Sequence, residues 1–191
     1  MKKEHLISEL EKLGIGLQRF TVGLEPFTER WLDAFDLVAG VLEPCLRGAR
    51  ISHIGSTAIP GSIAKPILDV GIAHSHSTDF EAETACLVSL GFTSKSEHGI
   101  EGRHFFTYFN EEKTYDYIHV HAFREAHPKH QAHLDFLHVH LADPSLVQKY
   151  NELKTGLVHS GVRRKDYPEV KTGYVEDVLA QVRRQRESPD P

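Results

Sequence analysis

The chain has 191 residues, of which 40% are hydrophobic and 26% charged, and its formal net charge is −5 at pH 7. This composition is typical of an ordinary globular protein, and the length fits a single domain over residues 1–191. It excludes a membrane-spanning helix, because no apolar run approaches the roughly 20 residues required, and its acidity disfavours a nucleic-acid surface.

The N-terminal segment is charged and places apolar residues such as Leu6 and Leu10 at helical spacing. This pattern predicts a helix over residues 3–13, which in one interpretation is an appendage, and it is unlike a signal peptide. A second helix is expected from Pro26 to about Leu46.

The cysteine content bears on the compartment. Cys45 and Cys86 are the two cysteines of the chain, and both lie in apolar helical surroundings. Two isolated thiols do not form a disulfide framework, so we interpret them as free core residues. Free thiols suit a reducing compartment, and we therefore expect a cytoplasmic protein.

The middle of the chain reads as strands and turns. Ile51 to Ile54 and Ile67 to Ala73 are predicted strands. Further elements follow in chain order: a helix from Asp79 to Leu90, strands over Phe92–Lys95, Arg103–Phe109 and Tyr115–Ala122, and a turn over Asn110–Lys113. After Pro128 the pattern is helical in about three segments, and the tail from Glu187 to Pro191 is expected to be disordered. This order predicts an α+β fold.

A family resemblance is carried by the segment from His53 to Val70, HIGSTAIPGSIAKPILDV. It resembles the signature of the GrpB family, a bacterial group related to the nucleotidyltransferase superfamily. Further segments that resemble the family are Leu24–Phe35, Glu97–Phe106, Tyr117–Phe123, Lys149–Lys154 and Asp166–Val175. The resemblance implies a nucleotidyltransferase-like mixed β-sheet, with helices on one face and a helical C-terminal part.

The residues of this segment favour phosphate chemistry. Gly55, Ser56 and Thr57 follow a strand directly, where backbone amides and hydroxyls form anion-binding turns; the alternative is an ordinary turn capped by Ser56 or Thr57. Asp69 lies within the next strand, where an unpaired charge would be unfavourable. Nucleotidyltransferases typically place a pair of acids there, but Gly71 stands at the second position.

Strand parity places Asp69, Tyr117, His119 and His121 on one open face of the sheet. Asp69, His119 and His121 are therefore candidate catalytic residues and candidate ligands for a divalent metal, Mg²⁺, Mn²⁺ or Zn²⁺. Imidazoles on one strand face suit a transition metal better than Mg²⁺. The alternative is a pair of structural histidines hydrogen-bonded to carbonyls or to Asp69.

Basic residues extend the predicted phosphate site. Lys65, Arg103 and Lys171 are candidate phosphate or nucleotide ligands, with Gly55, Ser56 and Thr57. Lys65 is otherwise a solvated loop residue, and Arg103 a structural ion-pair partner of Glu97 or Glu101. Lys171 follows Tyr167 by one helical turn, which matches a Tyr-x-x-x-Lys pattern of the family. His130 and His133, also one turn apart, are a weaker second pair.

Three hypotheses follow. The first is a nucleotidyltransferase-like domain that binds a nucleotide or phosphorylated small molecule and transfers a nucleotidyl group, with metal, to an unidentified acceptor. The alternative is a non-catalytic binding module on the same fold, which Gly71 favours. A third is a small metal-dependent hydrolase that uses Asp69 and the His-x-His pair. The sequence leaves the oligomeric state open.

Overall fold

The computed structural model of the chain describes residues 2–75, 80–163 and 166–187. Its centre is a six-stranded mixed sheet with the order β3-β5-β8-β7-β6, in which a short β1 also pairs with β8. β5 and β8 run parallel, whereas β3 and β7 run antiparallel to them. A separate two-stranded ribbon joins β2 and β4.

The strands of the large sheet are β1 Leu17–Gln18, β3 Arg50–Ile54, β5 Leu68–His74, β6 Thr93–Ser94, β7 His104–Phe109 and β8 Tyr115–Arg124. The ribbon consists of β2 Glu25–Pro26 and β4 Ile63–Ala64. The helices are α1 Lys3–Lys12, α2 Arg30–Leu42, α3 Glu81–Ser89, α4 Pro128–Ala142, α5 Pro144–His159 and α6 Tyr167–Glu187. Two 3₁₀ turns, η1 Glu43–Cys45 and η2 Ser56–Ala58, follow α2 and β3.

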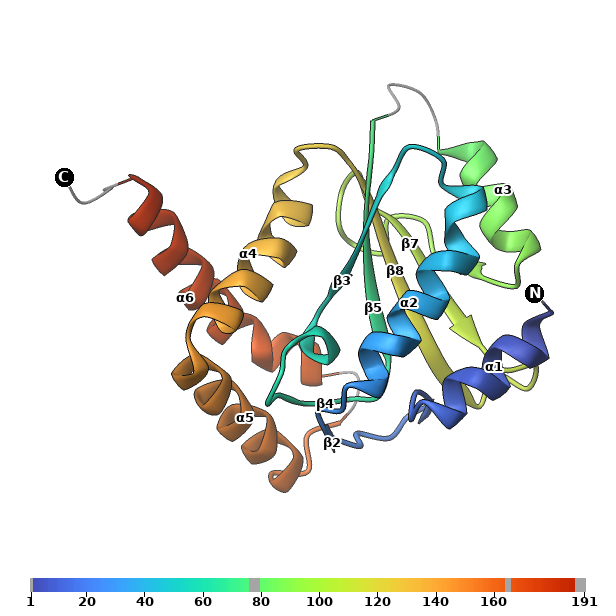
Figure 1. The fold of residues 1–191 in the computed structure, drawn as a ribbon. Coiled ribbons are helices and arrows are strands. Elements are labelled where there is room, and N and C mark those ends of the chain that lie inside the picture. The colour runs from blue at the N-terminus through green and yellow to red at the C-terminus, as the bar shows by residue number, and fades with distance from the viewer. Residues whose placement is uncertain (1, 76–79, 164–165, 188–191) are drawn as a thin grey trace.

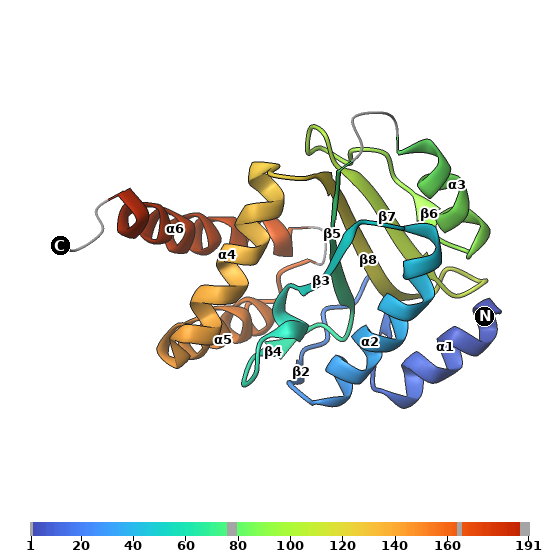
Figure 2. The same ribbon diagram turned by 45° about the horizontal axis from the view of Figure 1, so that its top comes forward.

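The helices form two groups around the sheet. In Figure 1, α1, α2 and α3 lie on one side, and α4, α5 and α6 gather on the other. Figure 2 shows the same division, with α4 and α2 flanking β3 on opposite sides. No helix in the described residues is long and apolar enough to cross a membrane.

Each group of helices has its own core. The first core joins the apolar face of the sheet, including Val70 and Val120, to side chains of α1 and α2 such as Leu10 and Trp31. Since Leu6 and Leu10 are both buried there, α1 is built into the fold. The second core holds α4, α5 and α6 together around Phe136.

These elements confirm the predicted α+β fold, the strand around Asp69 and the three C-terminal helices. The second helix starts later than predicted, at Arg30, because Glu25 and Pro26 pair with β4 and the amide of Phe27 donates to the carbonyl of Ser62. The start of the predicted helix at Asp79 lies outside the described residues. Of the predicted disordered tail, Glu187 is instead the last residue of α6, and residues 188–191 lie outside the described residues.

The prediction of two free thiols is wrong. Cys45 and Cys86 form a disulfide, which links the turn after α2 to α3 across a separation of 41 residues. The sequence could not show this, because the two cysteines meet only when η1 packs against α3. The cytoplasmic location therefore stays a prediction and loses the support of free thiols.

The placement of Tyr117 beside Asp69 is also wrong. Tyr117 is buried in the first core, where its hydroxyl donates to Glu11 Oε1 at 2.7 Å. An irregularity in the pairing of β7 with β8, between Tyr108 and Phe109, breaks the simple alternation of faces. Strand parity therefore fails at this bulge and holds beyond it.

Candidate functional site

The turn after β3 lies directly against the carboxylate of Asp69. β3 ends at Ile54, which is the register partner of Asp69, and Gly55 follows with φ 73° and ψ −172°. A Cβ atom at Gly55 would lie 2.5 Å from Asp69 Oδ2. Only glycine adopts this backbone conformation readily and leaves that space empty. The contact fixes the Gly55–Ser56 turn over Asp69.

Two imidazoles flank the same carboxylate. His119 is the register partner of Asp69, and His121 is the partner of Gly71 on the same face. His119 Nδ1 and His121 Nε2 each lie 3.5 Å from Asp69 Oδ1. The side chains of Asp69, His119 and His121 are 33%, 27% and 13% exposed, so the cluster is reachable by a ligand. The structure thus brings the three predicted residues together.

The charge of this cluster resides on Asp69. Burial alone would raise the pKa of Asp69, but the hydrogen-bonding and charge interactions of His119 and His121 outweigh it and bring the pKa below its ordinary value. Burial lowers the pKa of His121 despite the attraction of Asp69. Asp69 is therefore an anion at neutral pH, and His121 is mainly neutral.

Arg103 sets the orientation and tautomer of His121. Its guanidinium donates to the carbonyls of Glu97 and His98 at 3.1 and 2.7 Å, and Nη1 lies 3.4 Å from His121 Nδ1. Because a guanidinium only donates, His121 Nδ1 accepts and the proton belongs on Nε2, facing Asp69. Arg103, predicted to clamp phosphate, is buried here and positions His121.

Helix α4 lies across the face that the sequence left open. A Cβ atom at Gly71 would lie 3.1 Å from Ile54 Cγ2 and 3.6 Å from His130 Nε2, and the ring of His133 lies 5.1 Å from that of His121. Burial lowers the pKa of His133 to about 3. The face is therefore covered above Gly71, where Ile54 and the imidazole of His130, whose pKa burial also lowers, leave little room for a second carboxylate.

The donor set does not fit a preformed metal centre. In the residues that the structure describes, no three or more His, Cys, Asp or Glu side chains form a group that could hold a metal ion. His119 and His121 instead direct one ring nitrogen each at a single carboxylate oxygen. The predicted metal role of Asp69, His119 and His121 stays a prediction, and no step proposed below depends on a metal.

The two hydroxyls of the turn differ in their surroundings. Thr57 is buried, and its hydroxyl lies 3.0 Å from His53 Nε2, whose ring stacks on Phe35 of α2. Ser56 is half-buried, and no described group hydrogen-bonds to its hydroxyl. Ser56 is therefore the hydroxyl that remains available to a ligand, while Thr57 anchors the turn to the core.

The predicted lysines lie beside aromatic rings. Lys65 Nζ is 4.0 Å from the ring centre of Tyr167, and Lys171 Nζ is 4.8 Å from the same centre. Lys171 also donates to the hydroxyl of Tyr150 at 3.3 Å. The structure thus brings Lys171 of α6 to the same ring as Lys65, which lies on the segment that leads into Asp69.

The comparisons with known proteins identify the family. A family model described as GrpB protein matches residues 21–181. The chain belongs to the GrpB family. It is 32% identical over 133 residues to the UPF0157 protein YqkA of Bacillus subtilis, and the match covers 69% of this chain but only 38% of that protein. It is 26% identical over 171 residues to the glutamate-rich protein GrpB of Alkalihalophilus pseudofirmus, covering 86% of this chain and 98% of that one.

A solved structure agrees with this assignment. The crystal structure of the conserved protein GrpB from Enterococcus faecalis matches with a TM-score of 0.75 at 22% identity. The match covers 83% of this chain and 96% of that chain. At this identity the likeness establishes the fold of this GrpB-family chain and nothing about its activity.

A further lysine of this GrpB-family chain escaped the sequence analysis. Lys154, in α5, is 1% exposed and donates to Ser62 Oγ at 2.7 Å and to the carbonyl of Ile63. Its ammonium lies 4.1 Å from the ring centre of Tyr150, which also contacts Lys171. The segment Lys149–Lys154 resembles the family, but its last residue, Lys154, carries no signal of burial in the sequence.

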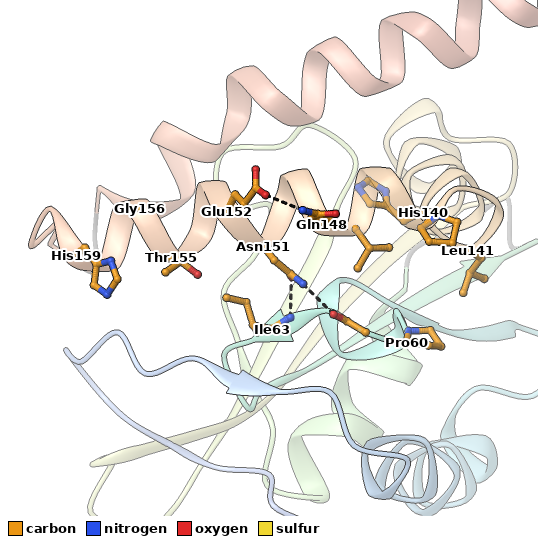
Figure 3. A pocket seen from close by; sticks show the side chains of 13 residues that line it. Pro60, Ile63, His140, Leu141, Gln148, Asn151, Glu152, Thr155, Gly156 and His159 are labelled. Carbon is orange, nitrogen blue, oxygen red and sulfur yellow. Dashed lines mark hydrogen bonds between the residues drawn. The ribbon is translucent and has the colours of Figure 1, made fainter.

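A surface groove lies apart from the cluster around Asp69. A groove of about 780 Å³ runs along α5 beside the loop that carries Pro60 and Ile63. Figure 3 shows Asn151 reaching this loop, where it accepts from the amide of Ile63 and donates to the carbonyl of Gly61. None of the predicted site residues lines the groove. It is therefore separate from the cluster around Asp69.

Proposed function

We propose that this GrpB-family chain binds a nucleotide or a related phosphorylated small molecule over the Gly55–Ser56 turn. The supporting observation is the contact of this turn with Asp69, whose carboxylate is flanked by His119 and His121. The backbone of the turn and the Ser56 hydroxyl would hold phosphate oxygens. Lys65 and Lys171 would balance the phosphate charge.

The same geometry supports a role for His119 in proton transfer. Its Nδ1 faces Asp69, so the carboxylate orients the ring and favours the tautomer with a proton on Nδ1. Nε2 is then a basic nitrogen that can accept the proton of an acceptor hydroxyl. In a nucleotidyl transfer, that hydroxyl oxygen would bond to the α-phosphorus while pyrophosphate leaves.

A second candidate is a binding module without turnover. A second carboxylate would normally accompany Asp69, but its place is Gly71, packed under Ile54 and His130. Without that charge, the site is weaker at stabilising the developing charge of phosphoryl transfer. We infer that ligand binding is the function common to both candidates.

A binding titration tests this proposal. Calorimetry with a panel of nucleoside triphosphates should give saturable binding, weakened roughly tenfold or more in Ser56→Ala and Lys171→Met, because each removes a charge-assisted contact. Lys95→Met is a matched control, since Lys95 also lies near a ring, that of Phe109, away from the turn. No triphosphate binding by the folded protein would contradict the proposal.

Turnover is measured in the same samples. Pyrophosphate release with a panel of acceptors, lost in His119→Ala, would indicate an enzyme. Binding without release in every combination would favour the module.

A further inference from the structure

Lys154 is a buried amine, and the described residues supply no anion to pair with it. Its ammonium donates only to neutral oxygens, those of Ser62 and Ile63, and faces the ring of Tyr150. Among the described side chains, no carboxylate forms a salt bridge with Lys154 or Lys171. A buried charge is retained at a cost unless a partner of opposite charge offsets it.

A second ammonium lies beside the first. Lys171, from α6, donates to the hydroxyl of Tyr150, the same residue whose ring faces Lys154. Burial, and then the charge of Lys171, lower the pKa of Lys154 to about 7. Lys171 is half-buried, whereas Lys154 is 1% exposed, so Lys171 is the outer and Lys154 the inner member of the pair.

The other groups around Lys154 do not supply the missing negative charge. On α6, burial raises the pKa of Tyr167 above its ordinary range. On α4, burial lowers the pKa of His140, whose ring nitrogens face the carbonyl of Phe136 and the hydroxyl of Tyr174. Both groups are therefore neutral near pH 7. The described part of the site therefore contains the amines of Lys154 and Lys171, with Lys65 beside Tyr167, and no carboxylate that pairs with Lys154 or Lys171.

We propose that Lys171 and Lys154 form a subsite for a polyphosphate, in which Lys171 contacts the anion and Lys154, one layer deeper, takes up a proton as it binds. The inference rests on the proposed function only in assigning this polyphosphate to a nucleotide.

The subsite is connected to Asp69 through a short stretch of chain. Lys154 donates hydrogen bonds to Ser62 and Ile63, which precede Asp69 by seven and six residues. An extended chain spans at most about 3.6 Å per residue, so Ile63 and Asp69 are within roughly 22 Å.

A polyphosphate suits this pair better than a single carboxylate. Its oxygens carry several negative charges along a flexible chain, which can match two ammonium groups at once. An anion beside Lys154 stabilises the protonated amine and raises its pKa above 7. Binding near pH 7.5 must therefore draw a proton from solution.

Calorimetry with inorganic tripolyphosphate at pH 7.5, in buffers of different ionisation enthalpy, measures the net number of protons exchanged on binding. Tripolyphosphate itself exchanges protons near this pH, so the reference is Lys154→Arg, whose guanidinium stays charged. The wild-type protein should bind and take up more protons per anion than Lys154→Arg, by up to about one, as expected for an amine whose pKa rises from about 7. Lys154→Met should abolish this excess and weaken binding roughly tenfold. Lys95→Met should change neither value.

Two further variants separate the roles. Lys154→Arg keeps a permanent charge and should bind with only the proton exchange of the anion itself. Lys171→Met leaves the buried contacts of Lys154 intact and should weaken binding, which protects the test if Lys154 variants fail to fold. A wild-type proton uptake no greater than that of Lys154→Arg, or an excess that persists in folded Lys154→Met, would overturn the proposal.

Different results would refute the polyphosphate subsite and the proposed nucleotide binding. If a nucleoside triphosphate binds and Ser56→Ala weakens it, but tripolyphosphate does not bind, the subsite is refuted alone. If tripolyphosphate binds with the excess proton uptake and no nucleotide binds, the subsite stands and the nucleotide assignment falls. If neither binds, both are refuted.

Discussion

Reduction of the Cys45–Cys86 disulfide is expected to lower the free energy of unfolding by about 4 kcal/mol. The bond closes a loop with a sequence separation of 41 residues, and opening it restores that freedom to the unfolded chain. Domains of this size are stable by only about 5–15 kcal/mol, so the loss is a large share. Urea unfolding with and without a reductant measures it.

The matched control is the double variant Cys45→Ala and Cys86→Ala. It should unfold at the same urea concentration with and without reductant, and close to the reduced wild-type protein. A wild-type protein whose unfolding does not respond to reductant, or whose mass shows two free thiols after purification without reductant, would contradict the disulfide.

The substitution Gly55→Ala is expected to remove ligand binding and to destabilise the fold. The new Cβ would meet Asp69 Oδ2 at 2.5 Å and Asp69 Cβ at 2.9 Å, in a backbone conformation that is essentially restricted to glycine. Strain of this kind alone is worth about 1–3 kcal/mol, and relief of the clash must move Asp69 or the turn. Thermal unfolding and triphosphate titration measure the two effects.

Gly99→Ala is the matched control, because Gly99 also has a positive φ, 82°, but its Cβ would meet nothing within 4 Å. The Gly99→Ala protein should lose part of the stability that Gly55→Ala loses, and it should bind the triphosphate as tightly as the wild type. A Gly55→Ala protein that binds as tightly as the wild type would show that the turn over Asp69 is not part of the ligand site.

Much of the candidate site could be predicted from the sequence, because strand parity is a local property. Asp69 stands out in an apolar run, and His119 and His121 alternate with apolar residues that face the core, so one shared face followed directly. Gly55 was recognisable as a turn residue. Its close contact with Asp69 was not, because the contact depends on the pairing of β3 with β5.

The rest depends on tertiary contacts that carry no local pattern. The buried residues of α4 include His130, Asp135 and His140, so this helix has no clear apolar stripe and its packing over Gly71 was not foreseen. From the sequence alone, Lys154 is expected to be a solvated lysine. In the structure it is fully buried against Ser62, which lies more than 90 residues earlier in the chain. Such contacts between distant segments appear only in the folded structure.

The location of the bound ligand tests the central claim most directly. NMR signals of the imidazole rings can be followed while a nucleoside triphosphate is added to the wild-type protein. Before addition, His121 should show the tautomer with its proton on Nε2, because its Nδ1 faces Arg103. At saturation the signals of His119 and His121 should shift, whereas that of His5 on α1 should not. Saturable binding that leaves His119 and His121 unchanged, or that shifts only His159 in the groove along α5, would contradict a phosphate site over Gly55 and Asp69.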